Sequence, residues 1–385
     1  MTPAPQTERH AGTRTLRLAV RGFGHVGQAL AHILADRGAS LEGEFGLRLV
    51  LGAASDSTGA VWSENGLNPL DLLQARAAGG LAHLAADRGR AAQNLREAAE
   101  QAGCSVWVDL SPTDVRTGGS ALADTRWALG RGLHLVTANK GPLAVAWGEL
   151  HRLARRSGSR LKYGGATAAA LPTASLAHYE LAGSQVTRLE GVLNGTSNFI
   201  LTAMGQGRDY AAALAEAQAR GIAERDPSLD VEGVDTAVKL LLLCNSLFGT
   251  ELSLQDIPRQ GITGVDPAKA LAARRRGGGL KLVAGAWRDG AAESAAVRCE
   301  VAVRQLPADH PLARVDGTEK GIVYETDLLG RLAVIGGGSG PTPAAASVLR
   351  DLINLGRELT GAPTVGGPIE VAAITKHEGF KWVQR

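Results

Sequence analysis

The segment GIAERDPSLDVEGVDTAVKL, at residues 221–240, places Glu224, Asp230, Asp235 and Lys239 before and within the start of one expected helix. Asp235 and Lys239 are four residues apart and therefore share a helix face. Asp230 is placed to cap the helix by accepting from its first free backbone N–H groups. For an isolated pair, an exposed salt bridge worth about 0.3–0.5 kcal/mol beside a plain cap would be a sufficient explanation.

The residues that follow, LLLLCNSLF, are apolar almost all round, which favours a buried helix whose polar end faces a cleft. A partly buried lysine beside carboxylates is a candidate proton donor, because such neighbours tune its pKa. This segment therefore predicts a substrate site.

A glycine motif near the N-terminus predicts a dinucleotide site. Residues 16–20 form an expected buried strand, residues 28–36 an expected amphipathic helix, and between them stand Gly22, Phe23, Gly24, His25, Val26 and Gly27. In this G-x-G-x-x-G arrangement the first glycine permits the tight turn, the second lets the pyrophosphate approach the backbone, and the third lets helix and strand pack closely. The alternative is a glycine-rich turn that binds nothing.

Further expected strands at residues 47–54, 106–110 and 133–137 alternate with helical segments, which is typical of a doubly wound parallel sheet. The ligand crevice of such a sheet lies at the carboxyl ends of its strands, where Ser111 and Lys140 occur. Asp56 follows the second strand and is the candidate partner for an adenosine ribose hydroxyl. Since Arg21 is also nearby, the choice between NAD and NADP stays open.

The pattern changes after residue 150. A strand at residues 188–193 leads into Asn194, Gly195 and Thr196, a small-residue turn before a helix expected at residues 199–204. Small residues at such a place let a ligand approach the backbone, although a plain strand-to-helix turn is the alternative. A second glycine turn near residue 336 precedes a helix to about residue 359, which we expect to return to the first domain.

The predicted fold class is α/β, with a Rossmann-type doubly wound parallel sheet and a second α+β domain for substrate binding and dimerisation. The expected divisions are a tail at 1–15, a dinucleotide-binding domain at 16–150 plus 336–360, a substrate-binding domain at 151–335, and a C-terminal tail at 361–385.

Composition excludes several other classes of protein. The chain of 385 residues has a net charge of only +3, with its basic residues scattered, so we expect no nucleic-acid partner. Three widely spaced cysteines favour a reducing cytoplasm over disulfides or thiolate metal sites, and we expect no metal centre built from them. No apolar run reaches the ~18 residues that a membrane span needs.

Six segments, in this order and at this spacing, resemble homoserine dehydrogenase: GFGHVG, TANKGPLA, LEGVLNGTSNFILTAM, GIAERDPSLDVEGVDTAVKL, HPLARVDG and GGGSGPTPAAASV. The similarity covers roughly residues 16–355, and the third and fourth segments are highly specific. The resemblance implies NAD(P)-linked interconversion of L-aspartate 4-semialdehyde and L-homoserine, on the route to threonine, methionine and isoleucine. It also implies a homodimer formed through the second domain.

The resemblance also implies roles for individual residues. Lys239 matches the proton donor, and Lys140 matches the lysine between cofactor and substrate. Glu224 and Asp235 match acids that hold the substrate's amino and hydroxyl groups. The remaining matches are Asp230, Asn194, Gly195 and Thr196 beside the substrate and Gly340 beside the cofactor.

Two positions depart from the family pattern. The family commonly has a glutamate, associated with a bound sodium ion, where this chain has Gly164, so a monovalent cation site is in doubt. A tyrosine is common where this chain has Ile222, which removes a hydroxyl donor near the substrate. The chain is expected to be a short form without the C-terminal amino-acid-sensing (ACT) domain, so feedback by threonine through that domain is not expected.

Two other functions remain open from the sequence. One is an NAD(P)-dependent reductase of another small amino-acid semialdehyde, and the other is a non-catalytic dinucleotide-binding regulator. The lysine beside carboxylates disfavours the regulator, because a binding module has no need of a proton donor.

Overall fold

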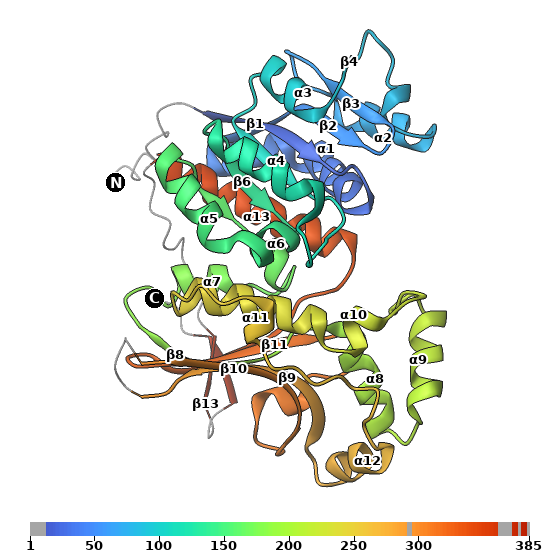
Figure 1. The fold of residues 1–385 in the computed structure, drawn as a ribbon, viewed down its shortest axis with the longest axis vertical. Helices are drawn as coiled ribbons and strands as arrows, with labels where there is room; N and C mark the ends of the chain where they lie inside the picture. Colours follow the sequence, from blue (N-terminus) through green and yellow to red (C-terminus); the bar gives the residue numbers. More distant parts are fainter. Residues whose placement is uncertain (1–12, 291–294, 361–371, 376–378, 383–385) are drawn as a thin grey trace, which may run out of the picture.

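The computed structural model describes residues 13–290, 295–360, 372–375 and 379–382. They form two lobes, each built on its own β-sheet, with helix α11 at the junction between them (Figure 1).

The first lobe holds a seven-stranded sheet in the order β4-β3-β2-β1-β5-β6-β7. Strands β1, β2, β5, β6 and β7 are parallel neighbours, whereas β3 and β4 add an antiparallel edge next to β2. The predicted doubly wound sheet is confirmed. Its strands are β1 (Arg14–Arg21), β2 (Leu47–Asp56), β3 (Gly59–Trp62), β4 (Arg90–Ala92), β5 (Val106–Asp109), β6 (His134–Thr137) and β7 (Leu161–Lys162).

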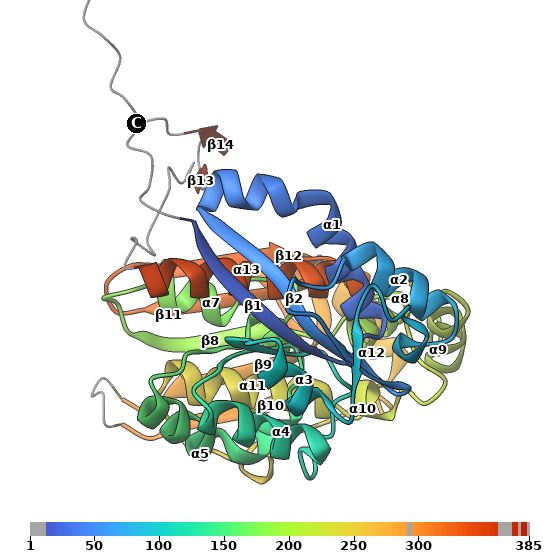
Figure 2. The same cartoon turned by 90° about the horizontal axis from the view of Figure 1, so that it is seen from above.

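Helices cover both faces of this sheet (Figures 1 and 2). They are α1 (His25–Phe45), α2 (Pro69–Ala77), α3 (Leu95–Gln101), α4 (Gly119–Gly130), α5 (Gly141–Ser157), α6 (Gly164–Thr167) and α13 (Pro341–Thr360), with a 3₁₀ turn, η1 (Leu81–His83). The expected end of the first helix near residue 36 is wrong, because α1 continues until Gly46 adopts a left-handed conformation. Buried Leu41 anchors these extra turns against the core.

The second lobe holds a five-stranded antiparallel sheet in the order β10-β9-β8-β11-β12. Its strands are β8 (Val186–Val192), β9 (Gly279–Arg288), β10 (Val297–Leu306), β11 (Lys320–Thr326) and β12 (Gly330–Gly336). Its helices are α7 (Ala174–Tyr179), α8 (Gly195–Gly205), α9 (Tyr210–Ala219), α10 (Ser228–Val231), α11 (Val234–Leu247) and α12 (Pro267–Arg275), with 3₁₀ turns η2 (Leu254–Asp256) and η3 (Pro311–Arg314). This is the predicted α+β lobe.

Helix α11 is buried on all sides, as its apolar sequence predicts. Leu240, Leu241 and Leu243 belong to the core of the second lobe, whereas Leu242 packs into the core of the first lobe beside Trp147. Because both lobes hold this helix, its polar first turn is fixed at the boundary between them.

Several expected domain boundaries need correction. Residue 150 lies inside α5, and β7 still pairs with β6, so the first lobe continues at least to Lys162. Strand β1 begins at Arg14, one residue before the expected end of the N-terminal tail, and residues 1–12 lie outside the described chain. Within the expected C-terminal tail, the described backbone forms a small hairpin of β13 (Ala372–Thr375) and β14 (Gly379–Trp382). Helix α13 packs against α1, with Val348 and Leu352 in the core of the first lobe, so this helix returns to the first lobe.

Candidate active site between the two lobes

The glycine turn between β1 and α1 is shaped by close contacts at two of its three glycines. A Cβ atom at Gly22, whose φ is +90°, would lie 2.7 Å from the backbone nitrogen of Ser111. A Cβ atom at Gly27 would lie 2.7 Å from the carbonyl oxygen of Gly22. Gly24, by contrast, is exposed, and nothing lies within 4 Å of the position its Cβ would take. Packing therefore requires Gly22 and Gly27, while Gly24 leaves open space beside the N-terminus of α1 for a ligand to approach the backbone.

The other residues of the turn differ in exposure. Phe23 is buried in the core of the first lobe, Val26 is partly buried against the same core, and His25 is exposed at the first position of α1.

A cavity of about 620 Å³ opens next to this turn. It reaches from Gly22 and Gly24 across the carboxyl end of β2 to Asn94, Ser111 and Asp124. A cavity of this size beside a glycine turn and a helix N-terminus suits a dinucleotide.

Asp56 lines the cavity, but its carboxylate already has partners. It accepts from the backbone of Thr58 at 2.8 Å and of Leu81 at 3.1 Å, and Arg76 lies 3.8 Å away. Burial raises the pKa of Asp56, but these hydrogen bonds and Arg76 lower it by more, so the carboxyl is held ionised. An expected ribose partner and a cation, Arg76, therefore lie together at this end of the cavity.

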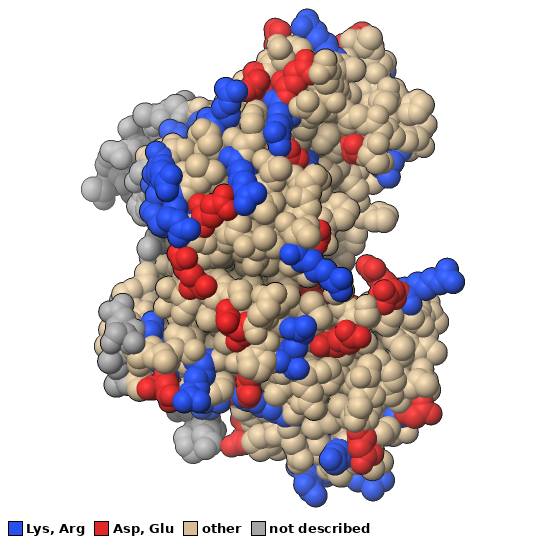
Figure 3. All heavy atoms as spheres, viewed as in Figure 1, with Lys and Arg blue, Asp and Glu red and all other residues tan. Residues whose placement is uncertain are grey.

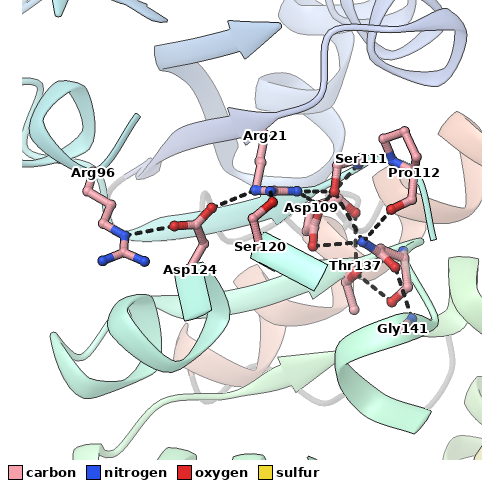
Figure 4. A network of polar contacts seen from close by, with 10 residues as sticks. Arg21, Arg96, Asp109, Ser111, Pro112, Ser120, Asp124, Thr137 and Gly141 are labelled. Carbon is pink, nitrogen blue, oxygen red and sulfur yellow. Dashed lines mark hydrogen bonds and ion pairs between the residues drawn. The ribbon is translucent and has the colours of Figure 1, made fainter. Parts of the chain in front are cut away.

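A network of polar side chains crosses the carboxyl ends of β1, β5 and β6 (Figure 4). The hydroxyl of Ser111 donates to Asp109 at 2.6 Å, and the Asn139 side-chain amide donates to Ser111 at 3.1 Å. Arg21 contacts Ser111 and pairs with Asp124 at 2.7 Å, and Arg96 binds the same carboxylate, also at 2.7 Å. The network holds the loop of Ser111, an expected cofactor contact, against the glycine turn.

Asp109 lies at the centre of this network and is fully buried. Burial raises its pKa, although Ser111 and Arg21 act in the opposite direction. The amide oxygen of Asn139 accepts from the backbone of Gly141 at 2.9 Å, which fixes the start of α5 and so the position of Lys140. Sequence analysis missed Asp109 and Asn139 as site residues, although both lie at or just after a strand end.

On the facing side, Asp235 joins two lysines from different lobes. Its carboxylate lies 2.6 Å from Lys239 Nζ and 3.5 Å from Lys140 Nζ, and it accepts from the Asn194 side chain at 2.9 Å. All three charged side chains are between 14% and 21% exposed. Each is therefore mostly shielded from solvent and has an oppositely charged partner. Burial raises the pKa of Asp235, but the two lysines and Asn194 lower it far more, to well below its usual range. The isolated surface salt bridge is thus the wrong interpretation of Asp235 and Lys239.

Asp230 does not cap α11, contrary to expectation. It lies in the short helix α10, and the N-cap residue of α11 is Gly233, whose left-handed conformation separates the two helices. The carboxylate of Asp230 instead accepts from the Asn194 side chain at 2.6 Å.

The Asn194 turn connects β8 to α8 and touches the charged cluster. The Asn194 side-chain oxygen caps α8 by accepting from the backbone of Ser197 at 2.8 Å, so its amide nitrogen is free to bind Asp230 and Asp235. Thr196 donates to the carbonyl of Ile222 at 3.1 Å. Ile222 itself is partly buried against the core of the second lobe, which explains how an apolar side chain is accommodated there.

A smaller cavity of about 190 Å³ lies in front of this cluster. Lys140, Glu224, Asp230 and Asp235 line it together with Thr113 from the first lobe, whereas Lys239 and Asn194 contact it through Asp235. Glu224 is exposed at its rim. The charges on this face of the molecule are mixed in sign (Figure 3).

The glycine turn just before α13, at residues 336–340, lies against the Asn194 turn. Gly195 packs so closely that its Cβ would lie 2.9 Å from the carbonyl of Thr318 and 3.2 Å from the Ser339 hydroxyl. Gly340 follows at the start of α13, exposed and with φ +113°. Lys320 is 4% exposed nearby, and burial, followed by repulsion from Lys239, lowers its pKa to about 8. No sequence motif indicated Lys320.

The structure brings most of the predicted residues into two adjoining groups. Gly22, Gly24 and Ser111 line the larger cavity, and Lys140 reaches from the first lobe to Asp235 in the second. In the described part of the chain, no three His, Cys, Asp or Glu side chains gather as a metal ion would require. Nor does any described helix combine the length and the hydrophobicity needed to cross a membrane.

A dinucleotide-sized cavity in one lobe and a lysine–carboxylate cluster that joins the two lobes are typical of a dinucleotide-dependent oxidoreductase with separate cofactor and substrate lobes. A family model described as homoserine dehydrogenase matches residues 172–353, and an NAD(+)-dependent homoserine dehydrogenase of Pseudomonas canavaninivorans is 36% identical over 353 residues. That alignment covers 89% of this chain and 97% of the relative. The chain belongs to the homoserine dehydrogenase family and is an NAD(P)-dependent oxidoreductase.

Two further proteins show the same similarity. A homoserine dehydrogenase of Methanocaldococcus jannaschii is 34% identical over 339 residues, covering 88% of this chain and 98% of the relative. A solved hyperthermophilic archaeal homoserine dehydrogenase in complex with NADPH superposes with a TM-score of 0.75 at 27% identity, covering 92% of this chain and all of that one. The similarity thus extends through both lobes.

Proposed function

We propose that this protein interconverts L-aspartate 4-semialdehyde and L-homoserine with NAD or NADP. The observation that carries the proposal is Asp235, which holds Lys239 of its own helix and Lys140 of the opposite lobe beside a small cavity. The family relationship supports the same reaction.

The bound nicotinamide supplies the hydride that reduces the aldehyde carbon. Negative charge then develops on the carbonyl oxygen and must be neutralised by a proton. We assign this proton to Lys239. Its ammonium has three N–H donors, of which one binds Asp235 and another the carbonyl of Leu193 at 2.9 Å, so one remains for the substrate oxygen.

Lys140 has a separate role in this proposal. It lies at the start of α5, where Asn139 fixes the backbone, and it lines the small cavity. From there it bridges the cofactor and substrate sides and orients the reacting carbonyl group.

Glu224, Asp230 and Asp235 give the cavity its acidic side. A substrate α-ammonium group is a suitable further partner for these carboxylates, whereas an aldehyde without one would not make this interaction. Asn194, Gly195 and Thr196 position this side, since Asn194 contacts two of the carboxylates directly.

The test is an initial-rate assay of homoserine oxidation with NAD and with NADP. We expect turnover with at least one of them. Absence of turnover with both, in a protein that binds a nicotinamide dinucleotide, would reject the proposal.

We also propose a homodimer formed through the second sheet. Strand β12 lies at an edge of that sheet, and the strand and the turn before it expose four large apolar side chains. Such an edge is a template for pairing with a second copy. These side chains are Leu328, Leu329, Leu332 and Ile335.

Sedimentation measurements test the dimer. We expect Leu332→Asp to shift the protein towards the monomer, whereas Leu70→Asp, at an exposed leucine of the first lobe, should leave the assembly unchanged. A monomeric wild-type protein at micromolar concentration would reject the dimer.

A cytoplasmic location remains part of the proposal. It is supported by Cys104, Cys244 and Cys299, which are all free thiols.

A further inference from the structure

The turn that follows α6 has an unusual backbone. Ala169 has φ +54° and is the only non-glycine residue with a positive φ in the part of the chain that the structure describes. Alanine rarely adopts this conformation, because its Cβ approaches the following carbonyl oxygen. Surrounding contacts must therefore hold the turn in place.

Two side-chain cations lie against three successive carbonyl oxygens of this turn. Lys320 donates to the carbonyl of Ala168 at 3.1 Å. The guanidinium of Arg350, from α13, contacts the carbonyls of Ala169 at 3.5 Å and Ala170 at 3.4 Å. The two contacts of Arg350 are long for hydrogen bonds, so their main component is the attraction between a charge and two carbonyl dipoles.

Arg350 is held in this position by its neighbours on α13. Its guanidinium donates to the Ser347 hydroxyl at 2.9 Å, and burial lowers its pKa although Asp351 acts in the opposite direction. Lys320 is almost completely buried and also reaches the carbonyl of Gly338 at 3.4 Å.

A carboxylate also belongs to this group, but it comes from α13 and not from the turn. Asp351 accepts from the backbone of Gly164 at 2.7 Å and is buried. A Cβ at Gly164 would lie 2.8 Å from the Asp351 carboxylate and 3.3 Å from Arg350. Side chains of α13 therefore fill the space that a longer residue at position 164 would need.

These residues do not fit the sodium ion that the resemblance associates with this turn. The turn has no carboxylate of its own at position 164, and protein cations already lie against its carbonyl oxygens. A metal ion here would meet repulsion from Arg350 and Lys320.

We propose that Arg350, together with Lys320, is a built-in replacement for a monovalent metal ion at residues 168–170. The protein therefore needs neither sodium nor potassium for stability or for activity. Arg350 acts as a positioning residue, because it touches the turn and not the reacting groups.

Contacts link the turn to the substrate side of the site. A Cβ at Gly337 would lie 2.7 Å from the backbone of Leu171, so the two turns are packed directly together. Lys320 joins the same two turns, and Ser339 lies against Gly195 of the substrate turn. Displacing the turn at residues 168–170 should therefore disturb the substrate turn more than the glycine turn at residues 22–27.

The first experiment compares the wild-type protein in sodium, potassium and choline chloride at equal ionic strength. We expect the melting temperature to be the same in all three salts and kcat/KM for homoserine to change by less than about twofold, because general screening is matched. A melting temperature that rises with sodium or potassium but not with choline would overturn the proposal. The activity measurement rests on the proposed function, but the melting measurement does not.

The second experiment removes the guanidinium with Arg350→Ala. We expect the KM for homoserine to rise about tenfold or more while the KM for the dinucleotide changes little, since small displacements near a reacting site are costly. Millimolar guanidinium should lower the KM of this variant for homoserine towards the wild-type value and raise its melting temperature. In Arg350→Lys the KM should rise less than in Arg350→Ala, because a positive charge remains.

The matched control is Arg357→Ala, on the same helix, where the guanidinium packs on the ring of Phe45 instead of on a carbonyl. Guanidinium should not restore any property of this variant. If Arg350→Ala keeps the wild-type KM, or responds to guanidinium no more than Arg357→Ala does, the replacement role is wrong. If Arg350→Ala does not fold, Arg350→Lys and the wild-type salt series still decide the question.

Discussion

The glycine turn and the lysine–carboxylate cluster offer a ligand two different kinds of interaction. The turn at residues 22–27 offers open space and backbone N–H groups, and its close contacts are between backbone atoms, from Gly22 to Gly27 and from Gly22 to Ser111. The cluster uses charged side chains from α10, α11 and the N-cap of α5, together with the Asn194 amide from the turn before α8. Its hydrogen bonds join residues 36 to 46 positions apart in the sequence.

This difference indicates how each site should respond to amino-acid substitution. A backbone site fails when an atom is added, because the added atom occupies space that the ligand needs. A charged cluster fails when a group is removed, because each charge loses a partner in a region of low solvent access. Each prediction below tests one side of this comparison.

The largest effect is expected from Lys239→Ala. Loss of the proton donor should lower kcat by about 100-fold or more, the usual range for such acid–base help, with the dinucleotide KM nearly unchanged. Steady-state kinetics with Lys269→Ala, at an exposed lysine of α12, as control measures this. A small loss in Lys239→Ala beside a large one in Lys140→Ala would move the proton-donor role to Lys140.

Asp235→Asn should have the next largest effect. It leaves two lysines from opposite lobes close together without their shared carboxylate, and loss of one partner from such a group costs about 2 kcal/mol or more. We expect kcat/KM for homoserine to fall by about 30-fold or more, whereas dinucleotide binding measured by fluorescence should persist. Equal losses in both measurements would mean that the variant disturbs the whole molecule.

Gly24→Ala tests the backbone site. The position has space for a methyl group and a negative φ, so folding should be unaffected. The methyl group would project where the pyrophosphate approaches, and we expect the dinucleotide KM to rise about tenfold.

Gly38→Ala is the matched control for Gly24→Ala, since it also adds a methyl group in open space on α1 but away from the cavity. This control should leave kinetics unchanged and stabilise the helix slightly. An unchanged dinucleotide KM in Gly24→Ala would contradict the assignment of the turn.

The last prediction concerns stability and not activity, and it is the pH dependence that arises from Lys320. Its pKa is about 8 in the folded protein, lowered by burial and by Lys239 despite the opposite effect of Asp235, against an ordinary value of 10.5. Between these pH values the unfolded chain binds more protons, so stability rises with pH by up to about 3 kcal/mol from this group.

Urea unfolding of the wild-type protein and of Lys320→Met across this pH range tests the effect. The variant should show a flatter profile than the wild type. The same slope in both proteins would place the titration elsewhere.

Local features of the fold follow from the sequence alone. The glycine motif, the strand before it, the apolar helix after residue 234 and the small-residue turn at Asn194 are all short patterns in which neighbouring residues determine the conformation. The prediction for the start of α11 was wrong because two nearby residues were both suitable for that position. Asp230 is a good cap by residue type, but Gly233 adopts a left-handed conformation and begins α11 on its own.

Other site residues could not be identified from the sequence. Lys320 and Arg350 lie in no motif, and their importance arises because β11 and α13 bring two cations to one turn about 150 to 180 residues earlier in the chain. In the sequence, Asp109 is an aspartate at the end of a strand. Only in the folded protein do burial, Ser111 and Arg21 change its pKa.

The sequence by itself determined which backbone turns can approach a ligand and which side chains could carry charge, because both depend on residue type and short spacing. Only the tertiary structure decided which charges meet. Lys140 joins Asp235 because α11 is packed between the two lobes, and Arg350 reaches residues 168–170 because α13 returns to the first lobe. Electrostatic energies depend on separation and burial in space, and neither quantity can be obtained from spacing along the chain.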